Sequence, residues 1–283
     1  MRGRGYKVKE DSNDGQAESG ASGISIHTPG RLHGRKNSAL SLINSETKII
    51  EYLKKHKIEF LHFLTDVNNV SSIFSNGILS LNRVREQSLE FRDISSSNVQ
   101  LIREYKKPGI TDSKNLHHYV PLYFATQTPT QYIISHSATL RGRENIISQD
   151  MLVFIDIDPL AIFTLPNVIF TDGNAAASET VFFNDINDLD KIDWDVINCP
   201  GDYYGSNGRC YGKEWKRIKC SEVLVPNYIS VELFSRIVVF SKSGADHFFE
   251  KINPLQNRVQ KDFYNRIKKC VKYSDQLVSK YYF

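Results

Sequence analysis

A carboxylate at the start of an apolar strand and an arginine in a mixed segment are the side chains best suited to chemistry. Glu222 precedes the apolar residues 223–225, where a negative charge is costly unless it is paired, lies at the rim or takes part in a reaction. Arg103 lies among residues 99–106, which mix apolar and charged side chains, and it can hold a phosphate or carboxylate through two hydrogen bonds. The residues alone leave alternatives open: Glu222 can be a paired structural acid, and Arg103 can belong to a solvated helix face.

Two further segments place polar or small residues beside apolar strands. His117 and His118 precede the apolar run of residues 119–124, and ligand-binding groups are common at strand ends, although a single histidine is more often structural. Residues 170–177 join a strand to a loop of small residues, which lets the backbone approach a planar ligand closely. The same loop can be a simple turn that leads into a capped helix.

Positive charge is densest at residues 213–219, which read Lys-Glu-Trp-Lys-Arg-Ile-Lys. The net charge of +4 is a weak argument for a nucleic-acid partner, so the clustering of the charge matters more. Sites for single-stranded nucleic acid combine cations with aromatic rings on which bases stack. The side chains predicted to contact a single-stranded nucleic acid are Lys213, Trp215, Lys216, Arg217 and Lys219.

Several common catalytic motifs are absent from the sequence. It contains no phosphate-loop motif, no Gly-x-Gly-x-x-Gly opening a helix, no His-Glu-x-x-His and no Gly-x-Ser-x-Gly. The cysteines form no Cys-x-x-Cys pair and indicate reduced structural thiols; they are Cys199, Cys210, Cys220 and Cys270. We therefore expect no metal, and metal-dependent hydrolysis and serine-type acyl transfer are poor candidates.

The elements that must position these residues form a mixed pattern. Strands are expected at residues 60–64, 120–124, 152–156, 168–170, 222–225 and 237–240. Helices are expected from Ser45 through Leu53 and at residues 70–75, 128–135, 186–190, 245–252 and 255–271. The elements do not alternate regularly, which favours an α+β fold with a central, largely antiparallel sheet. Residues 81–115 are polar and predicted to be a long irregular segment that is functional or mobile.

Composition separates the start of the chain from the rest. Residues 1–44 are rich in glycine, serine and charge, so we expect a disordered N-terminal extension before a single domain of residues 45–283 with a C-terminal helical tail. No apolar run approaches the roughly 20 residues that span a bilayer, and no secretory signal opens the sequence. A cytoplasmic location without a membrane partner is therefore expected.

The motifs above, taken together and in order, resemble the DarT family of NAD-dependent enzymes. The likeness spans roughly Phe60 to Ser241, and its most specific pieces are Leu116-His117-His118-Tyr119-Val120-Pro121-Leu122-Tyr123-Phe124, Phe170-Thr171-Asp172-Gly173-Asn174-Ala175-Ala176, Asn184-Asp185 with residues 189–194, and Glu222-Val223-Leu224-Val225. The resemblance implies an ADP-ribosyltransferase-like fold, in which a split, mostly antiparallel sheet with flanking helices cradles NAD. It also implies mono-ADP-ribosylation of a thymine or guanine base in single-stranded DNA. The enzyme would be a bacterial toxin whose cognate antitoxin carries a macrodomain.

The resemblance assigns roles by position. Arg103 looks like the arginine that binds the NAD phosphates and supports catalysis, and Glu222 looks like the catalytic glutamate. The side chains implied to contact NAD as co-substrate are Arg103, His117, Tyr119, Asn68, Asn69 and His62, and Asn174 is implied to contact DNA. Many family members carry a histidine where this chain has Phe63, and the neighbouring His62 faces the opposite side of a strand.

Two other functions stay open at the level of sequence. The chain can be an ADP-ribosyltransferase that acts on RNA or protein, because sequence indicates the acceptor poorly. It can also be a non-catalytic module that binds single-stranded nucleic acid through a degenerate NAD site. The presence of both Arg103 and Glu222 favours an enzyme.

Overall fold

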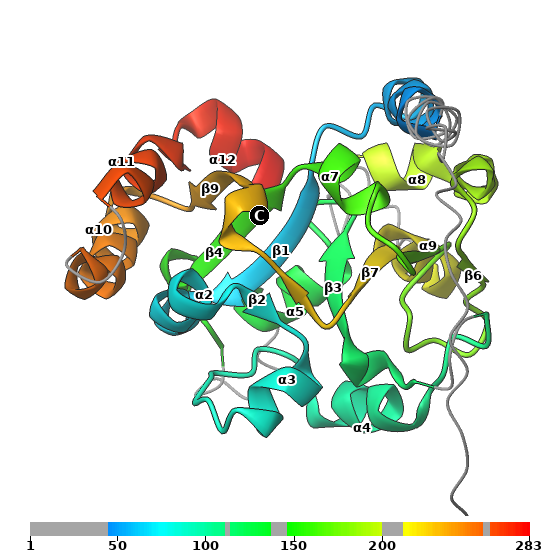
Figure 1. The fold of residues 1–283 in the computed structure, drawn as a ribbon, viewed down its shortest axis with the longest axis horizontal. Helices are drawn as coiled ribbons and strands as arrows, with labels where there is room; N and C mark the ends of the chain where they lie inside the picture. The colour runs from blue at the N-terminus through cyan, green and yellow to red at the C-terminus, as the bar shows by residue number, and fades with distance from the viewer. Residues whose placement is uncertain (1–44, 111–113, 137–145, 200–211, 257–260) are drawn as a thin grey trace, which may run out of the picture. The chain divides into compact units, whose positions relative to one another are not determined.

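The computed structural model describes residues 45–110, 114–136, 146–199, 212–256 and 261–283; the predicted disordered extension, residues 1–44, lies outside them. Leu42–Phe283 form one compact unit. Its centre is an 8-stranded sheet with the order β10-β9-β4-β1-β3-β7-β5-β6 (Figure 1). The strands are β1 (Leu61–Asp66), β3 (Tyr119–Tyr123), β4 (Leu152–Ile157), β5 (Ile169–Thr171), β6 (Phe182–Phe183), β7 (Glu222–Pro226), β9 (Phe234–Val239) and β10 (Val271–Lys272). All neighbours pair antiparallel except β10 and β9, so the expected α+β class is confirmed.

Helices flank this sheet, and a small second sheet pairs β2 (Ile78–Leu79) with β8 (Tyr228–Ile229). Residues 45–55 form the first described helix, as predicted. The other α-helices are α2 (Val70–Asn76), α3 (Leu81–Glu86), α4 (Ser97–Tyr105), α5 (Pro129–His136), α7 (Pro159–Phe163), α8 (Trp194–Asn198), α9 (Lys213–Lys219), α10 (Lys242–Ile252), α11 (Lys261–Cys270) and α12 (Asp275–Tyr281). Short 3-10 helices are η1 (Val67–Asn69), η2 (Leu116–His118), η4 (Gln149–Met151), η5 (Ile186–Lys191), η6 (Val231–Leu233) and η7 (Asn253–Leu255).

The sheet consists of two halves that barely touch. Strand β1 pairs with β4 along its whole length, and β3 does the same with β7. Among the described residues, β1 and β3 pair only at His62 and Tyr123. On either side of that pair the two strands leave a gap in the hydrogen-bond ladder, and this gap is where a ligand can enter the sheet.

Both faces of the sheet are covered by apolar side chains, as the alternation of side chains along a strand requires. One face packs Ile155 and Val153 of β4 against Phe74 of α2 and Phe248 of α10. The other face carries a second cluster, made of Leu64, Ile134, Ile147, Leu152, Phe154, Val238, Tyr281 and Tyr282. The second cluster places α5 and α12 on the face opposite α2 and α10.

The prediction that residues 81–115 are irregular is wrong, because the segment contains α3 and α4. The start of α4 is capped by Ser96, whose hydroxyl accepts a hydrogen bond from the N–H of Val99 at 3.3 Å. Arg103 is the one buried residue that α4 carries, so the helix contributes no apolar side chain to the core. The helix predicted near residues 255–271 is confirmed over α11, Lys261–Cys270, whereas Leu255 belongs to η7 and Val271 to β10; residues 257–260 lie outside the described ranges.

The C-terminal tail is tied into the sheet by a buried polar network. Tyr281 donates its hydroxyl to Asp156 Oδ2 at 2.7 Å, and the same oxygen accepts a hydrogen bond from Arg236 at 2.8 Å. His62 Nδ1 lies 2.7 Å from the other carboxylate oxygen. Burial by itself would raise the pKa of Asp156, but His62, Tyr281 and Arg236 outweigh it and hold the pKa below its ordinary value of 3.8. The network therefore stabilises the fold with Asp156 ionised.

We expect Tyr281→Phe to lower the free energy of unfolding by about 1.5–3 kcal/mol, because the variant loses hydrogen bonds to charged groups. Chemical denaturation at neutral pH measures the difference, with the exposed Tyr228→Phe as the control. Since the pKa of Asp156 is lowered on folding, the contribution of the carboxylate is complete above its ordinary value of 3.8 and is lost as the pH falls through the lowered pKa. Equal stability of the two variants at neutral pH would contradict the expectation.

Candidate active site

The structure brings Arg103 and Glu222 into direct contact across 119 residues of sequence. Arg103 Nη1 donates to Glu222 Oε2 at 2.9 Å and to Oε1 at 3.2 Å. Arg103 is 9% exposed and Glu222 is 1% exposed, so this is a buried ion pair. Glu222 is the first residue of β7 and Arg103 lies in the last turn of α4, so the pair joins the helix to the sheet.

The loop of small residues holds the glutamate in place. Ala175 donates its N–H to Glu222 Oε1 at 2.9 Å. The backbone N–H of Glu222 donates to Thr171 Oγ1 at 2.9 Å, and that hydroxyl lies 2.6 Å from the carbonyl of Gly173, to which it donates. Asn174 accepts a hydrogen bond from the N–H of Ala176 at 2.8 Å and so shapes the loop from within. The main chain of the loop therefore binds the carboxylate, as its small residues permit.

Sequence reasoning missed two polar side chains beside the pair. Tyr123 lies directly opposite Glu222 in the ladder of β3 and β7, and burial, followed by the charge of Glu222, raises its pKa. Lys106 donates to the carbonyl of Ala177, and burial lowers its pKa although Glu222 acts in the opposite direction. Both had a signal in the sequence: Tyr123 lies within the strand predicted at residues 120–124, and Lys106 follows Arg103 by three residues.

Arg217 packs against the loop of small residues, residues 170–177. It pairs with Asp172 at 2.8 Å and with Glu214 at 2.7 Å. A Cβ atom on Gly173 would overlap the Arg217 side chain, lying 2.9 Å from both its Cγ and its Cζ. The glycine is therefore required for the arginine to pack against this loop.

We expect Gly173→Ala to lower the free energy of unfolding by about 1–3 kcal/mol, since the added methyl group overpacks a held side chain. The displaced loop also carries the N–H that binds Glu222, so catalytic activity should fall with it. Chemical denaturation and turnover measurements check both effects. Gly212→Ala is a matched control, because a Cβ there meets no atom within 4 Å; an equal response of the two variants would contradict the packing argument.

A cavity of about 200 Å³ lies in the split between β1 and β3. Its walls include Phe63 and Thr65 of β1, Pro121 and Tyr123 of β3, and the predicted NAD-contacting residues Asn69, Arg103, His117 and Tyr119. Glu222 is not among the lining residues, and Arg103, which contacts it, links it to the cavity. The cavity thus brings together four of the side chains that the sequence assigned to NAD.

Two buried side-chain nitrogen atoms at the cavity lack a protein partner within the described ranges. They are Arg103 Nη2 and His117 Nδ1. The other nitrogen of His117 lies 2.8 Å from Gln100 Oε1, and burial lowers the pKa of His117. Buried polar atoms are normally paired, so these two fit a site that receives a polar ligand.

Of the residues predicted to contact NAD, Asn69 lines the cavity but is engaged by the backbone, and Asn68 and His62 lie apart from it. Asn69 bonds the backbone of Arg92 at 2.7 and 2.9 Å, so it fixes the cavity wall. Asn68 donates to Asp66 Oδ1 at 2.7 Å and does not line the cavity. His62 points away from it and lines a second cavity at the other end of the split. The alternation of side chains along β1 explains why Phe63, rather than His62, faces the predicted NAD site.

The structure also divides the side chains predicted to contact DNA. Lys213 is 94% exposed along its side chain, and Trp215 and Lys216 are part-exposed on the same helix. Arg217 is held by its two acids, and Lys219 is 3% exposed and donates to the carbonyls of Ile197 and Cys199. Lys219 therefore does not lie where it could contact a DNA strand on the outer surface of α9.

In the described part of the chain, no three His, Cys, Asp or Glu side chains come together as metal ligands. None of the helices there combines the length and apolar character needed to cross a bilayer.

Comparison with known proteins places these features in context. A family model described as "ssDNA thymidine ADP-ribosyltransferase, DarT" matches residues 62–267. A DNA ADP-ribosyl transferase of Thermus aquaticus is 26% identical over 187 residues, which are 65% of this chain and 76% of that protein. A DNA ADP-ribosyl transferase–DNA ADP-ribosyl glycohydrolase fusion protein of Thermosipho africanus is 25% identical over 195 residues; they are 68% of this chain but 45% of the fusion protein.

Solved structures agree with the fold. DarT of Thermus sp. 2.9 in complex with ADP-ribosylated single-stranded DNA superimposes with a TM-score of 0.65 and 22% identity, covering 80% of this chain and 97% of that one. The same protein in complex with NAD+ gives a TM-score of 0.58 at 22% identity, covering 80% of this chain and 98% of that one. The expected fold, a split, mostly antiparallel sheet with flanking helices, is confirmed.

Proposed function

Because this chain belongs to the DarT family, we propose that it transfers the ADP-ribose unit of NAD to a thymine base of single-stranded DNA. The observation that carries the proposal is the buried contact of Arg103 with Glu222 beside the cavity in the split sheet. The family description names thymidine and single-stranded DNA as the substrate, and solved relatives were obtained with NAD+ and with a modified strand.

The residues at the cavity fit the binding of NAD. Arg103 has a fixed positive charge and a free Nη2, which suits a diphosphate. His117 offers a second buried nitrogen. At about 200 Å³ the cavity is smaller than the roughly 300–1,000 Å³ typical of ligand sites, so the surrounding segments must open to admit a dinucleotide. As Arg103 turns to the diphosphate, Glu222 becomes free to meet the nicotinamide ribose.

We assign Glu222 a role in both halves of the transfer. The bond from ribose C1′ to nicotinamide breaks and leaves positive charge on the sugar, which a fixed carboxylate stabilises. A nitrogen of the thymine base then forms the new bond to C1′ and releases its proton. We assign Glu222 as the group that accepts this proton. The thymine ends as an ADP-ribosyl adduct, and nicotinamide leaves as the second product.

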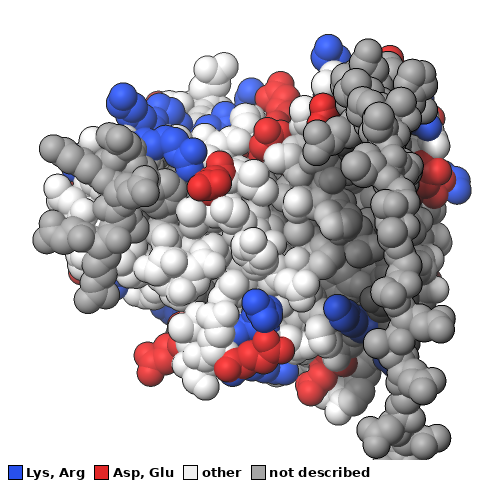
Figure 2. Space-filling model, viewed as in Figure 1, with Lys and Arg blue, Asp and Glu red and all other residues white. Residues whose placement is uncertain are grey.

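The acceptor must be a single strand or an extruded base, because a duplex hides the edges of its bases. Tyr105, two residues beyond Arg103, is 73% exposed and offers a ring for stacking. Lys213 and Lys216 remain the candidates for phosphate contacts. In Figure 2, positive and negative side chains are mixed over α3 and α4, so this face presents no uniform cationic surface. Stacking of a DNA base on Tyr105 would therefore contribute to DNA binding together with the phosphate contacts of the lysines.

We further propose that the chain acts as a toxin whose effect a macrodomain glycohydrolase reverses. The Thermosipho africanus relative joins a transferase to a glycohydrolase in one protein, which supports such a pairing. A glycohydrolase that removes ADP-ribose from DNA would reverse the modification proposed for this chain.

A labelled-NAD assay with DNA, RNA and protein acceptors in parallel tests the proposed function. The expected result is label on single-stranded DNA, little on duplex, and none on RNA or protein. Label confined to RNA or protein would favour a transferase with another acceptor. Salt-sensitive DNA binding without any NAD turnover would favour a non-catalytic binding module.

A further inference from the structure

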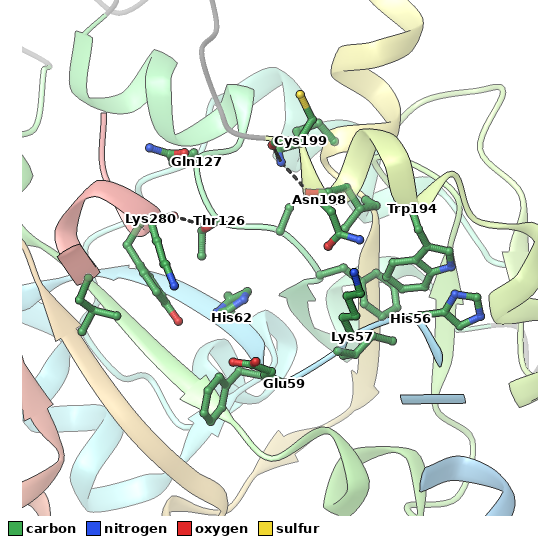
Figure 3. Close-up of a pocket in the computed structure, with 18 of the residues that line it drawn as sticks. His56, Lys57, Glu59, His62, Thr126, Gln127, Trp194, Asn198, Cys199 and Lys280 are labelled. Carbon is green, nitrogen blue, oxygen red and sulfur yellow. Dashed lines mark hydrogen bonds between the residues drawn. The ribbon is translucent and has the colours of Figure 1, made fainter. Parts of the chain in front are cut away.

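A second cavity, of about 520 Å³, lies at the opposite end of the split from the candidate active site. It opens between the start of β1 and the end of β3, beyond the pair formed by His62 and Tyr123. Figure 3 shows Lys57 and Lys280 on opposite sides of this cavity, with His62 between them and Trp194 forming one wall. Its volume falls within the roughly 300–1,000 Å³ of small-molecule sites.

The cavity contains a buried cation that no acidic side chain among the described residues neutralises. Lys219 lines the cavity and is 3% exposed. Its amine donates to the carbonyls of Ile197 and Cys199, both at 2.6 Å, and within the described ranges it forms no ion pair with a carboxylate. Burial lowers its pKa to about 8. A buried charge is costly without a partner, so an anion in the cavity would relieve that cost.

The rest of the lining is also positive on balance. Lys57 and Lys280 are exposed at the rim, and neither forms an ion pair with a described residue. The charge of Arg236 is balanced by Asp156 at 2.8 Å. The described part of the lining contains one acidic side chain, Glu59, and three lysines, Lys57, Lys219 and Lys280. A ligand with at least one negative charge therefore complements the cavity.

The aromatic wall indicates what else the ligand carries. Trp194 stacks on His56 with ring centroids 4.8 Å apart and meets Phe124 edge-on at 5.2 Å, so the indole is held in one orientation. A fixed aromatic side chain beside several cations is the combination that binds a planar base together with its phosphate.

We propose that this cavity is a second binding site, which takes one nucleoside phosphate with its base near Trp194 and its phosphate near Lys57, Lys219 and Lys280. The nucleotide comes either from solution or from a DNA strand that also reaches the active site. If the nucleotide belongs to a DNA strand, the proposal rests on the proposed function. If the nucleotide comes from solution, the proposal does not depend on the proposed function.

Calorimetric titration with thymidine 5′-monophosphate tests the proposal on the full chain, with the active site first filled by a non-hydrolysable NAD analogue. We expect binding to the wild type and at least about tenfold weaker binding to the double variant Lys57→Asn/Lys280→Gln. Asparagine suits position 57, where φ is 58°. Lys242→Gln, an exposed lysine outside the cavity, is the matched control. Near pH 8, titrations in buffers of different ionisation enthalpy should show proton uptake, because phosphate restores the charge of Lys219.

The two sources of the nucleotide are separated by a parallel titration with a single-stranded oligonucleotide. If the strand supplies the nucleotide, the double variant also binds the oligonucleotide more weakly, with a salt dependence reduced by about two phosphate contacts. If the nucleotide comes from solution, oligonucleotide affinity stays unchanged.

The proposal is overturned if the monophosphate does not bind when the active site is filled, or binds the double variant as well as it binds the wild type. The second result would assign the monophosphate to the position of the acceptor base. These outcomes are distinct from a failure of the proposed function, which would abolish NAD-dependent DNA labelling and leave the titration of the monophosphate unaltered.

Discussion

Glu222→Gln is expected to slow ADP-ribose transfer to DNA by at least about 100-fold, the scale associated with removing a group that accepts a proton in the transition state. The amide oxygen can take the place of Oε1, where it accepts from Ala175 at 2.9 Å and from Arg103 at 3.2 Å, while the NH2 group replaces the oxygen that accepts from Arg103 at 2.9 Å. The substitution removes the negative charge and the ability to take up a proton. Single-turnover measurement with saturating NAD and oligonucleotide isolates this step from binding.

The exposed Glu232→Gln serves as the control for Glu222→Gln, because it makes the same chemical change away from the site. The control should transfer ADP-ribose at the wild-type rate. If folded Glu222→Gln retained more than about a third of the wild-type rate, the residue would be a structural acid and not the catalytic one.

Arg103→Met is expected to lower the free energy of unfolding by about 3–5 kcal/mol, because it leaves a buried carboxylate without its counter-charge. Glu222 is 1% exposed, so water cannot replace the lost guanidinium without rearrangement. The same variant should lose NAD binding, since the cation assigned to the diphosphate is gone. Urea unfolding and NAD titration measure the two effects separately.

A double-mutant cycle shows whether the pair acts as a unit. We expect Arg103→Met/Glu222→Met to be more stable than Arg103→Met alone, because removing both charges restores a neutral interior. Strictly additive losses in the two single variants would mean that the contact between Arg103 and Glu222 contributes nothing to the fold.

The sequence predicted the strands of the sheet better than the surroundings of the site. Strand β7 was predictable because it contains a run of apolar side chains that favour the interior, Val223, Leu224 and Val225, and all three are buried. The contact of Glu222 with Arg103 follows no local rule, since it joins residues 119 positions apart; only the family resemblance pointed to both. Helices α3 and α4 escaped prediction because they are short and bury no apolar side chain.

The basic segment of α9 shows why composition misleads at this level of detail. Five side chains within seven residues were predicted to face DNA, yet a helix distributes neighbouring residues around its axis. Arg217 is turned inward to Asp172 and Lys219 is buried against backbone carbonyls. Only the tertiary structure could separate these cations from Lys213, which is exposed.

Tandem mass spectrometry of a mixed-sequence single-stranded oligonucleotide, incubated with the protein and NAD, tests the central claim most directly. The account predicts a mass increase of one ADP-ribose unit that fragmentation assigns to a thymine nucleotide. The increase should be absent when Glu222→Gln replaces the wild type. An oligonucleotide of unchanged mass recovered from a reaction in which the wild-type protein has consumed NAD would contradict the account.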